Sequence, residues 1–398
     1  MECRGEDMAK YRTLKSLFHE NESIFKQKYT ERFNGENTLK FSFDIKGLPA
    51  FAVLTPEMII RGDSIRKMQI RLERLEATIP CKPFILMDSV FQEIEQSNEI
   101  EGVHSSRRDL ENALNGKPGT RFAGQMEQYF RLLSGEVKFP YNPLDVRQLY
   151  NEMLLQDVVS EHPENRPDGR VFRADTVGVV DGTRTIHNGI MPESMIISMM
   201  EQALELVRNE NYPFLVRAAV FHFMFGYIHP FYDGNGRLNR FLTSMLISEE
   251  LSILSSLQLS LSFRKNRRQY YKAFEASENP LNKGDLTPFI LMFLEILESA
   301  LKHEIVKLES QLEKYEQYLS KLNAASLKPA EKTFLETLLA ASLFSLYGIS
   351  KQQMIQITQM SQSWVDKTLK KHRDKLNVRR EGHAKWYSMN KEFLATLV

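Results

Sequence analysis

The stretch YIHPFYDGNGRLNRF, residues 227–241, decides how the middle of this chain folds. It continues an apolar segment, residues 214–228, that predicts a buried helix ending before Pro230, because proline disfavours helical backbone in the residue before it. A second helix, RLNRFLTSMLISEEL, is expected to begin near Gly236 or Arg237. The sequence therefore predicts two helices joined by a short polar turn.

The turn itself carries the features of an anion site. Gly234 and Gly236 permit positive φ angles and expose successive amide groups, which form a concave nest for an anion. The free amides and the positive dipole end of the second helix point into the same turn. Arg237 and Arg240 are three residues apart, so they share a helix face and can both reach the oxygens of a polyphosphate. These residues predict a phosphate-binding site.

An acid and a histidine add chemistry to this site. Asp233 would repel a bare phosphate, but it fits a magnesium ion, which commonly binds through one or two carboxylates together with phosphate oxygens. His229, at the end of the first helix, can take the proton from a hydroxyl that attacks phosphorus. Each of these residues alone is common at helix ends and turns that bind nothing. Together they predict nucleotidyl or phosphoryl transfer.

Composition limits what this site can belong to. The 398 residues, 42% hydrophobic and 26% charged, suffice for about two or three domains. The 52 basic and 51 acidic residues nearly balance, so attraction to nucleic acid or to an anionic membrane would need a local patch. Two cysteines, Cys3 and Cys81, supply no disulfide framework and fit a reduced compartment. Without a signal peptide or an apolar run of ~18 residues, we expect a cytoplasmic protein with no membrane segment.

Patterning divides the chain into three segments. We expect an N-terminal arm and helices over residues 1–115, a central helical domain over 116–325 and a small C-terminal domain over 326–398. Alternation in LKFSFDIKGLPAFAVLTPEMII predicts an early hairpin or extended arm. Val and Thr on both sides of an Asp-Gly turn predict a second hairpin within residues 169–189. Nearly all other segments predict helices, so the expected fold class is mainly α.

A long helix is expected to begin near Thr287. Its apolar residues recur at alternating steps of four and three, the pattern of a heptad seam, at Leu301, Ile305, Leu308, Leu312, Tyr315, Leu319 and Leu322. The seam fits either a long helix packed against its own chain or a dimeric coiled coil.

The C-terminal segment predicts three short helices followed by two short strands, an order that resembles a winged helix-turn-helix domain. Residues 361–398 hold nine Lys or Arg against four acids, a net charge of +5. Such a surface fits DNA, while protein contact or dimer packing fits the same fold. We expect Trp364 and Trp386 in the core of this domain.

The residues around the turn resemble a known family. They match, at every defined position, the signature H-x-F-x-[D/E]-G-N-G-R-x-x-R of Fic (filamentation induced by cAMP) domains. The matching residues are His229, Phe231, Asp233, Gly234, Asn235, Gly236, Arg237 and Arg240. The resemblance implies a Fic-type helical bundle with a small β-hairpin flap over residues 116–325, which moves AMP from ATP to a Ser, Thr or Tyr hydroxyl of a target protein.

The same resemblance assigns roles to these residues. It implies that His229 deprotonates the target hydroxyl and that Asp233 holds Mg²⁺ against the α and β phosphates. The other positions would bind phosphate or pack in the core: Gly234, Asn235 and Gly236 as a cradle, Arg237 and Arg240 on the β and γ groups, and Phe231 as an apolar anchor.

The flap of the family corresponds here to TVGVVDGTRTIHNGIMP, residues 176–192, where a target would dock by strand addition. The nucleotide is expected to lie against Val177, Gly178, Val179 and Val180. The usual double proline after the flap is only Pro192. Further on, Tyr271 either packs on adenine or is a core aromatic. Glu278 stands where an asparagine that contacts the base is expected, so specificity for adenine is not secured.

A second pattern of the family lies upstream. QSNEIEG, residues 96–102, matches [S/T]-x-x-x-E-[G/N] through Ser97, Glu101 and Gly102. The resemblance implies that Glu101 pairs with Arg240 and keeps the γ phosphate of ATP out of a productive pose, because a carboxylate and a phosphate compete for the same guanidinium. What relieves this inhibition, and whether the glutamate also supports the reverse reaction, stays open.

Two functions from different classes follow. The first is an autoinhibited protein adenylyltransferase with ATP and Mg²⁺, for which self-modification, a homodimer and DNA contact through the winged helix stay open. The second is a DNA-binding transcriptional regulator that uses the Fic domain as a nucleotide sensor. The intact catalytic set favours the enzyme, because a sensor has no need of the base.

Overall fold

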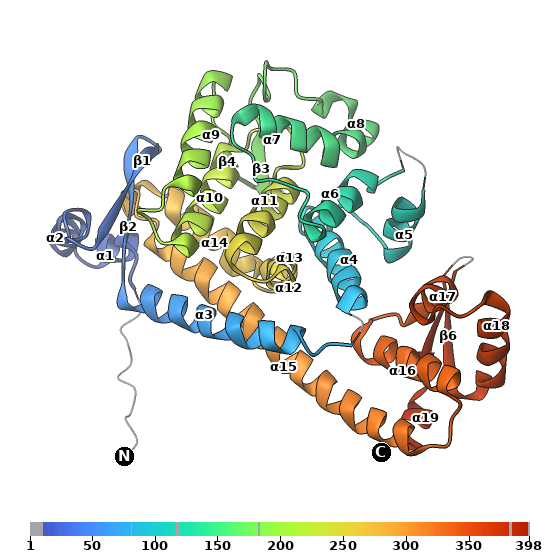
Figure 1. Cartoon of the computed structure of the whole chain (residues 1–398). Helices are drawn as coiled ribbons and strands as arrows, with labels where there is room; N and C mark the ends of the chain where they lie inside the picture. Colours follow the sequence, from blue (N-terminus) through green and yellow to red (C-terminus); the bar gives the residue numbers. More distant parts are fainter. Residues whose placement is uncertain (1–10, 81, 117–119, 182–183, 382–383, 397–398) are drawn as a thin grey trace, which may run out of the picture. The chain divides into compact units, whose positions relative to one another are not determined.

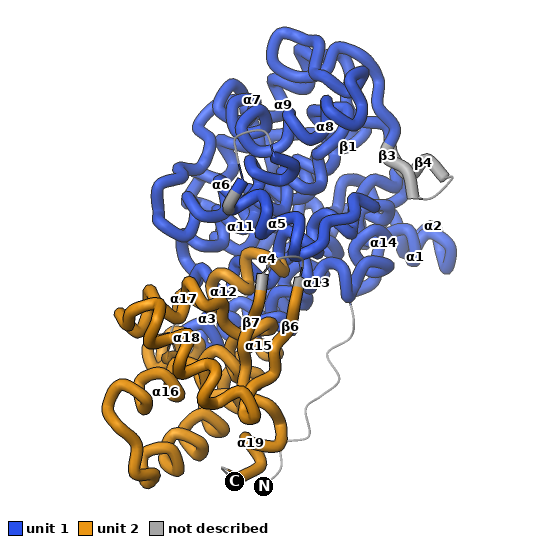
Figure 2. Tube along the Cα trace, turned by 90° about the vertical axis from the view of Figure 1, so that its right-hand side faces the viewer, with its two compact units in different colours: residues 1–69, 93–301 blue, residues 70–92, 302–398 orange. Residues whose placement is uncertain are grey.

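The computed structural model describes residues 11–80, 82–116, 120–181, 184–381 and 384–396. It is built mainly from helices, with small two- and three-stranded sheets, so the expected fold class is confirmed (Figure 1). The chain forms two compact units: one comprises Met1–Gln69 and Glu93–Leu301, the other Ile70–Gln92 and Lys302–Val398 (Figure 2). The division falls inside three helices, and the three sequence segments stay a prediction.

The first unit opens with helices α1 (Leu14–Glu20) and α2 (Glu22–Phe33) and a hairpin of β1 (Thr38–Ile45) and β2 (Leu48–Val53). The two strands pair in antiparallel register, as the alternating sequence predicted. Their inner face carries buried Phe51, which packs with α1 and α2. The hairpin therefore closes a small core of its own.

Helices make up the rest of this unit, interrupted by one more hairpin, and α3, α4 and α15 belong to it only in part. Their bounds are α3 (Pro56–Glu76), α4 (Lys82–Ile100), α5 (Arg107–Asn115), α6 (Ala123–Leu133), α7 (Pro143–Tyr150), a π-helical turn (Asn151–Leu155), α8 (Gln156–Glu161), α9 (Glu193–Arg208), α10 (Phe214–Ile228), α11 (Asn235–Glu250), α12 (Ile253–Ser256), α13 (Leu259–Lys265), α14 (Arg267–Glu278) and α15 (Thr287–Ala324). The hairpin consists of β3 (Gly178–Asp181) and β4 (Arg184–Asn188), antiparallel and irregular between Val179 and Val180.

Helix α10 lies in the centre of this unit, packed against α9 and α11. It is buried on all its faces because it is apolar all round, as its sequence predicted. Helix α11 is also buried, but it carries polar residues that need internal partners. Asn239 donates to the His222 carbonyl (2.9 Å), and the ring of His222 contacts the Thr243 hydroxyl (2.7 Å). Burial lowers the pKa of His222 to about 3, so its ring is neutral. The ring links α10 to α11 and fixes the two helices relative to each other.

The second unit contains the C-terminal elements, which are α16 (Pro329–Phe344), β5 (Ile349–Ser350), α17 (Lys351–Thr358), α18 (Gln362–Lys371), β6 (Leu376–Glu381), β7 (Ala384–Met389) and α19 (Lys391–Thr396). The strand order is β5-β7-β6. The three expected helices and two strands are present, and β5 and α19 were not expected. The winged helix-turn-helix assignment stays a prediction. Trp386 is buried and Trp364 packs edge-on against Phe334, as expected of core residues.

The heptad seam of α15 is covered within the chain. Leu301, Ile305, Leu308, Leu312 and Leu322 are all buried. Tyr315 and Leu319 are partly buried. This burial favours the first of the two alternatives, a long helix packed against its own chain, and the dimeric coiled coil stays a prediction.

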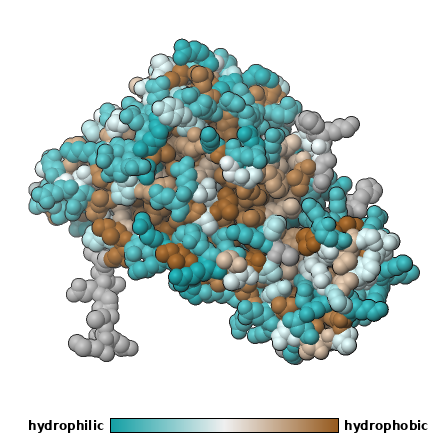
Figure 3. Space-filling model, in the orientation of Figure 1, coloured by the Kyte–Doolittle hydropathy of each residue, from teal (hydrophilic) through white to brown (hydrophobic). Residues whose placement is uncertain are grey.

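Among the described residues, no helix has the length and apolarity that a membrane crossing requires. On the face shown in Figure 3, hydrophobic residues are interspersed among hydrophilic ones. Exposed apolar side chains scattered in this way are ordinary for protein surfaces.

Candidate active site

His229 ends helix α10 in a left-handed conformation, with φ 51°. Its N–H donates to the Phe225 carbonyl (3.0 Å), which closes the helix, and its carbonyl accepts from the Arg173 Nε (2.9 Å). A left-handed residue at a helix C-terminus reverses the chain direction. The histidine is thereby fixed at the start of the turn, where the sequence predicted it.

The turn is closed by its own asparagine. The Asn235 Oδ1 accepts from the Phe231 N–H (2.9 Å), and its Nδ2 donates to the Phe231 carbonyl (2.8 Å). Phe231 is fully buried and stacks on Tyr150, with ring centroids 3.8 Å apart, as expected of an apolar anchor. The Asn235 side chain is therefore used within the turn, so its contribution to the predicted cradle is limited to its main chain.

Two glycines shape the start of α11 in different ways. Gly234 has φ 81° and precedes the helix without a side-chain cap, which leaves the first amides of α11 available for an anion. Gly236, expected at a positive φ, lies inside the helix instead. A Cβ atom there would lie 2.0 Å from the Glu101 Oε1. Gly236 is thus required for close approach of a carboxylate to the helix N-terminus.

Asp233 and Arg237 form a pair inside the turn. The Arg237 Nη2 donates to the Asp233 Oδ1 (3.1 Å), which also accepts from the Gly234 N–H. Arg237 is only 3% exposed, and in the described part of the chain its Nε has no hydrogen-bond partner. That buried donor points to a missing anionic ligand.

The acid can serve a metal ion only together with a ligand. The described residues contain no cluster of three or more His, Cys, Asp or Glu side chains that would hold a metal alone. The Asp233 side chain is 36% exposed, so it can reach a bound nucleotide. A single carboxylate beside a phosphate cradle fits Mg²⁺, which commonly takes one or two protein carboxylates and fills its shell with phosphate and water oxygens.

Arg240 is held by Ser97 of helix α4 and by Glu101, the residue just after this helix. Its Nη1 lies 2.8 Å from the Glu101 Oε1, its Nε donates to the Ser97 Oγ (2.9 Å), and its Nη2 donates to the Ser97 carbonyl (2.8 Å). Arg240 is 1% exposed. The ion pair that the resemblance implied is therefore present, with Ser97 as a second partner.

Gly102 completes this arrangement through its backbone. With φ 74°, it donates to the Glu99 carbonyl (3.1 Å), and the next N–H, of Val103, donates to the Asn98 carbonyl (3.0 Å). These two bonds define a Schellman motif, whose left-handed position favours Gly and then Asn. The alternatives Gly and Asn in the inhibitory pattern follow from this helix ending.

Further side-chain contacts hold α4 in place, and they were not predicted from the sequence. Glu93 accepts from the Ser260 N–H (2.9 Å) and hydroxyl (2.6 Å), and Arg264 donates to Gln96 (2.7 Å) and to Glu99. Glu93 is fully buried, and burial raises its pKa to about 7, although the charge of Arg240 opposes this. Its spacing of four residues from Ser97 was the available signal.

The remaining predicted residues of the flap differ in how near the structure places them to the turn. Val177 is near His229, because a Cβ at Gly189 would lie 3.0 Å from the Val177 Cγ1 and 3.1 Å from the His229 Cβ. Gly178 begins β3, while the side chains of Val179 and Val180 lie outside the described residues.

Helix α14 carries the last two residues that the sequence analysis considered. Tyr271 is partly buried, and burial, followed by the charge of Glu101, raises its pKa. Glu278 is buried, with a carboxylate oxygen 3.6 Å from the Lys46 Nζ at the β1–β2 turn.

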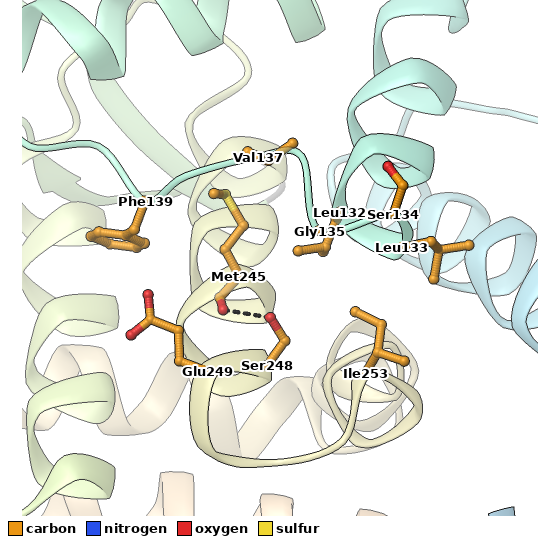
Figure 4. A pocket seen from close by; sticks show the side chains of 10 residues that line it. All are labelled: Leu132, Leu133, Ser134, Gly135, Val137, Phe139, Met245, Ser248, Glu249 and Ile253. Atoms are coloured by element: carbon orange, nitrogen blue, oxygen red, sulfur yellow. Dashed lines mark hydrogen bonds between the residues drawn. The ribbon is translucent and has the colours of Figure 1, made fainter.

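A hollow of about 350 Å³ lies at the other end of α11 (Figure 4). It is lined by Leu132, Leu133, Ser134, Gly135, Val137, Phe139, Met245, Ser248, Glu249 and Ile253. Burial raises the pKa of its one acid, Glu249, and the lining contains no arginine or lysine. This hollow lacks the chemistry of a phosphate site.

Comparison with known proteins agrees with this geometry. Residues 140–247 match the model of the Fic/DOC family. The chain carries a Fic domain. The motif, the turn, helix α10 and all but the last turn of α11 lie within the matched residues, so the family resemblance read from the sequence is confirmed.

Two curated relatives extend the match. The "Protein adenylyltransferase Fic" of Drosophila mojavensis and that of Drosophila grimshawi are each 26% identical over 226 residues, 54% of this chain. The match spans 41% and 42% of those proteins, less than half of their length.

A solved structure supports the fold. A Fic family protein from Desulfovibrio desulfuricans G20 superposes with a TM-score of 0.53 at 16% identity, over 85% of this chain and 97% of that one. This chain therefore shares its fold with that protein over most of its length.

Proposed function

We propose that this Fic domain transfers AMP from ATP to a hydroxyl group of a protein. The observation that carries the proposal is the short turn that joins His229, at the end of α10, to the uncapped N-terminus of α11. Asp233 of this turn pairs with the buried Arg237 in the first turn of α11, whose Nε has no partner among the described residues. The relatives named protein adenylyltransferase support this choice among phosphoryl and nucleotidyl transfers.

In the proposed reaction, each group of the turn has one role. His229 accepts the hydroxyl proton while the hydroxyl oxygen attacks the α phosphorus of ATP. The bond from the α phosphorus to the bridging oxygen of the β phosphate breaks, and pyrophosphate leaves with the electron pair. The α11 amides and Arg237 stabilise the charge on the phosphates. Mg²⁺ held by Asp233 would neutralise part of the same charge.

The contact between Arg240 and α4 accounts for autoinhibition in this proposal. The Glu101 carboxylate lies against Gly236 in the first turn of α11, where the helix dipole stabilises an anion. It also pairs with the Arg240 guanidinium, which the γ phosphate of ATP would need. A phosphate oxygen and this carboxylate compete for one position, so the enzyme idles until Glu101 moves.

The β3–β4 hairpin is the proposed docking element for the target. It is a two-stranded sheet, so its outer edges have backbone groups that a third strand can use. A target segment added there would present its hydroxyl near Val177 and His229, which lie close to the hairpin base. A loop of a second copy of this chain fits the same element, which would give self-modification.

The test is intact-mass spectrometry of the Glu101→Gly variant incubated with ATP and Mg²⁺. We expect a mass increase of one AMP moiety on the protein itself or on an added lysate protein. The matched control, the double variant with His229→Ala, is expected to gain nothing. Absence of AMP from both variants, with ATP bound in calorimetry, would contradict the proposal.

A second function is favoured by one observation in the second unit. Lys367 and Lys370 are exposed three residues apart on α18, and Arg380 and Lys385 lie directly opposite each other across β6 and β7, both exposed. Like charges opposite each other on a sheet are destabilising, which a bound polyanion would offset. We propose that α18 and the β6–β7 ribbon bind double-stranded DNA.

This proposal is tested with the full chain and a labelled short duplex at increasing salt. We expect binding that weakens steeply with salt, since phosphate contacts release counterions. Lys367→Gln with Lys370→Gln should weaken it, whereas Lys265→Gln with Lys272→Gln, two exposed lysines of α13 and α14, should not. Binding should survive His229→Ala. Equal losses in both lysine pairs would overturn the proposal.

A further inference from the structure

Arg173 is a fully buried arginine in the segment that leads to strand β3. Its guanidinium donates to main-chain carbonyls of three separate segments. Nε donates to His229 (2.9 Å), Nη1 to Asp175 (2.6 Å), and Nη2 to Ile190 (2.8 Å) and Ile228 (3.4 Å). One side chain therefore joins both ends of the β3–β4 hairpin to the turn of the motif.

These bonds come at a cost that apolar packing would avoid. In the described part of the chain, the acceptors of Arg173 are these carbonyls and the Met191 sulfur (3.2 Å), with no carboxylate among them. Burial of the charge lowers the pKa of the guanidinium. The charge of Asp175 opposes this shift, but Asp175 accepts from the guanidinium through its carbonyl oxygen. A buried cation without a hydrogen-bonded carboxylate is weak support for stability alone. Its rigid fork of five donors does, however, fix the relative geometry of all the groups it binds.

The main chain around Arg173 continues the same junction. The Arg173 N–H donates to the Pro230 carbonyl (3.2 Å), and the Ile190 N–H donates to the Ile228 carbonyl (3.1 Å). The hairpin base and the histidine turn are thus bonded side by side, with the guanidinium between them.

Gly189 shows how tightly this junction is packed. A Cβ atom there would lie 2.3 Å from the Arg173 Nη2 and 3.1 Å from the His229 Cβ. Any side chain at this position would displace the guanidinium or the histidine. The chain therefore keeps the hairpin within van der Waals distance of the motif turn.

We propose that Arg173 is the positioning residue of the active site, holding His229 and the base of the β3–β4 hairpin in one fixed register. The inference rests on the proposed function, because it concerns the distance between the His229 ring, the proposed general base, and a hydroxyl presented on the hairpin. Arg173 bonds to neither Gly234, Arg237 nor Arg240, so it should govern turnover and not nucleotide affinity.

The kinetic test compares variants in the Glu101→Gly background. Arg173→Met and Arg173→Lys should lower kcat for AMP transfer by roughly 10- to 100-fold, the usual result of a misplaced catalytic group, while KM for ATP stays unchanged. Lysine should not rescue, because it cannot form the fork. Arg170→Met, an exposed arginine of the same segment, is the matched control and should be neutral. A folded Arg173→Met variant with unchanged kcat overturns the inference.

A second measurement keeps the two proposals separable. In protein labelled with ¹⁵N-histidine, the His229 ring signal, assigned by its loss in His229→Ala, should move in Arg173→Met and stay in Arg170→Met. Gly189→Ala should move it as well and serves if Arg173→Met does not fold. A moved signal without any AMP transfer in Glu101→Gly would contradict the proposed function but retain the positioning role. An unmoved signal overturns the role.

Discussion

Arg237 and Arg240 lie three residues apart on α11 and are both buried, yet their surroundings differ. Within the described residues, Arg237 forms an ion pair with Asp233 and its Nε has no hydrogen-bond partner, whereas Arg240 binds Ser97 of α4 twice and Glu101 once. In the proposed enzyme, the turn would thus be open to the nearer phosphates of ATP and closed to the outer one. Nucleotide binding and its inhibition would then depend on neighbouring arginines but on different elements of the chain.

The largest expected effect concerns Glu93, a second acid whose pKa responds to the charge of Arg240. Its pKa is raised from 4.5 to about 7 by burial, so the folded chain binds this proton more tightly than the unfolded chain. Stability should therefore fall as the pH rises from about 4.5 to about 7, by about 3 kcal/mol in total, and then level off.

Glu93→Gln should remove this fall, because the amide does not ionise. Calorimetric unfolding across that pH range gives the comparison, with Glu99→Gln, an exposed acid of the same helix, as the control. Parallel pH curves for the wild-type chain and Glu93→Gln would show that this acid does not titrate as proposed. The groups that face it are Ser260 of α13, Arg240 of α11 and Tyr129 of α6.

The next effect opens the Arg240 side. A charge-assisted hydrogen bond contributes about 1.5–3 kcal/mol, so Glu101→Gly should raise the rate of AMP transfer roughly 10- to 100-fold. The affinity for ADP should not change, since ADP has no γ phosphate to compete with Glu101. Rates with labelled ATP and calorimetry with ADP check both parts. A parallel gain in ADP affinity would mean that Glu101 blocks the whole cradle.

The contrast can also be probed from the arginines. In a chain that keeps Glu101, Arg237→Gln should weaken Mg²⁺-ADP binding by about tenfold, because a buried donor to phosphate is lost. Arg240→Gln should leave this binding unchanged, since α4 already occupies that guanidinium. Calorimetry of both variants, each first confirmed to be folded, decides the matter. Equal losses of Mg²⁺-ADP affinity in the two variants would contradict the proposal that Arg237 is open to phosphate and Arg240 is not.

The smallest effect concerns the helix ending that holds Glu101. Gly102→Ala places a Cβ in a left-handed conformation, which costs about 1–2 kcal/mol and should raise AMP transfer by a few fold as the last turn loosens. Gly102→Asn is the matched control, because asparagine accepts this conformation more readily. The two rates are compared in the same assay. Equal rates of AMP transfer in the two variants would show that the conformation of Gly102 does not affect inhibition.

Much of the site could be predicted from the sequence because its signals are local. The apolar run before Pro230 predicted α10 with the bounds that the structure has, and the spacing of Arg237 and Arg240 gave their shared face. The pairing of Glu101 with Arg240 followed from the family pattern. The conformation of Gly236 was predicted wrongly, since its role is to admit Glu101 and not to turn the chain.

Other parts of the site could not be predicted because their partners are distant and carry no side-chain signal. Arg173 binds carbonyl groups, which every residue has, so nothing in the sequence marks its acceptors. Ser260 and Arg264 meet α4 only through the fold. Tertiary contacts of this kind need coordinates, whereas motif spacing and helix periodicity do not.

The position of Glu101 at the very end of α4 has a thermal consequence. It lies just beyond Ile100, in a terminal turn held by the main-chain bonds of Gly102 and Val103. Fraying of a helix end costs far less free energy than undocking of a whole helix. The Glu101 carboxylate can therefore leave Arg240 while the hydrogen bond between Arg240 and Ser97 stays in place. Basal turnover in the proposed enzyme should then be small but continuous, rising smoothly with temperature.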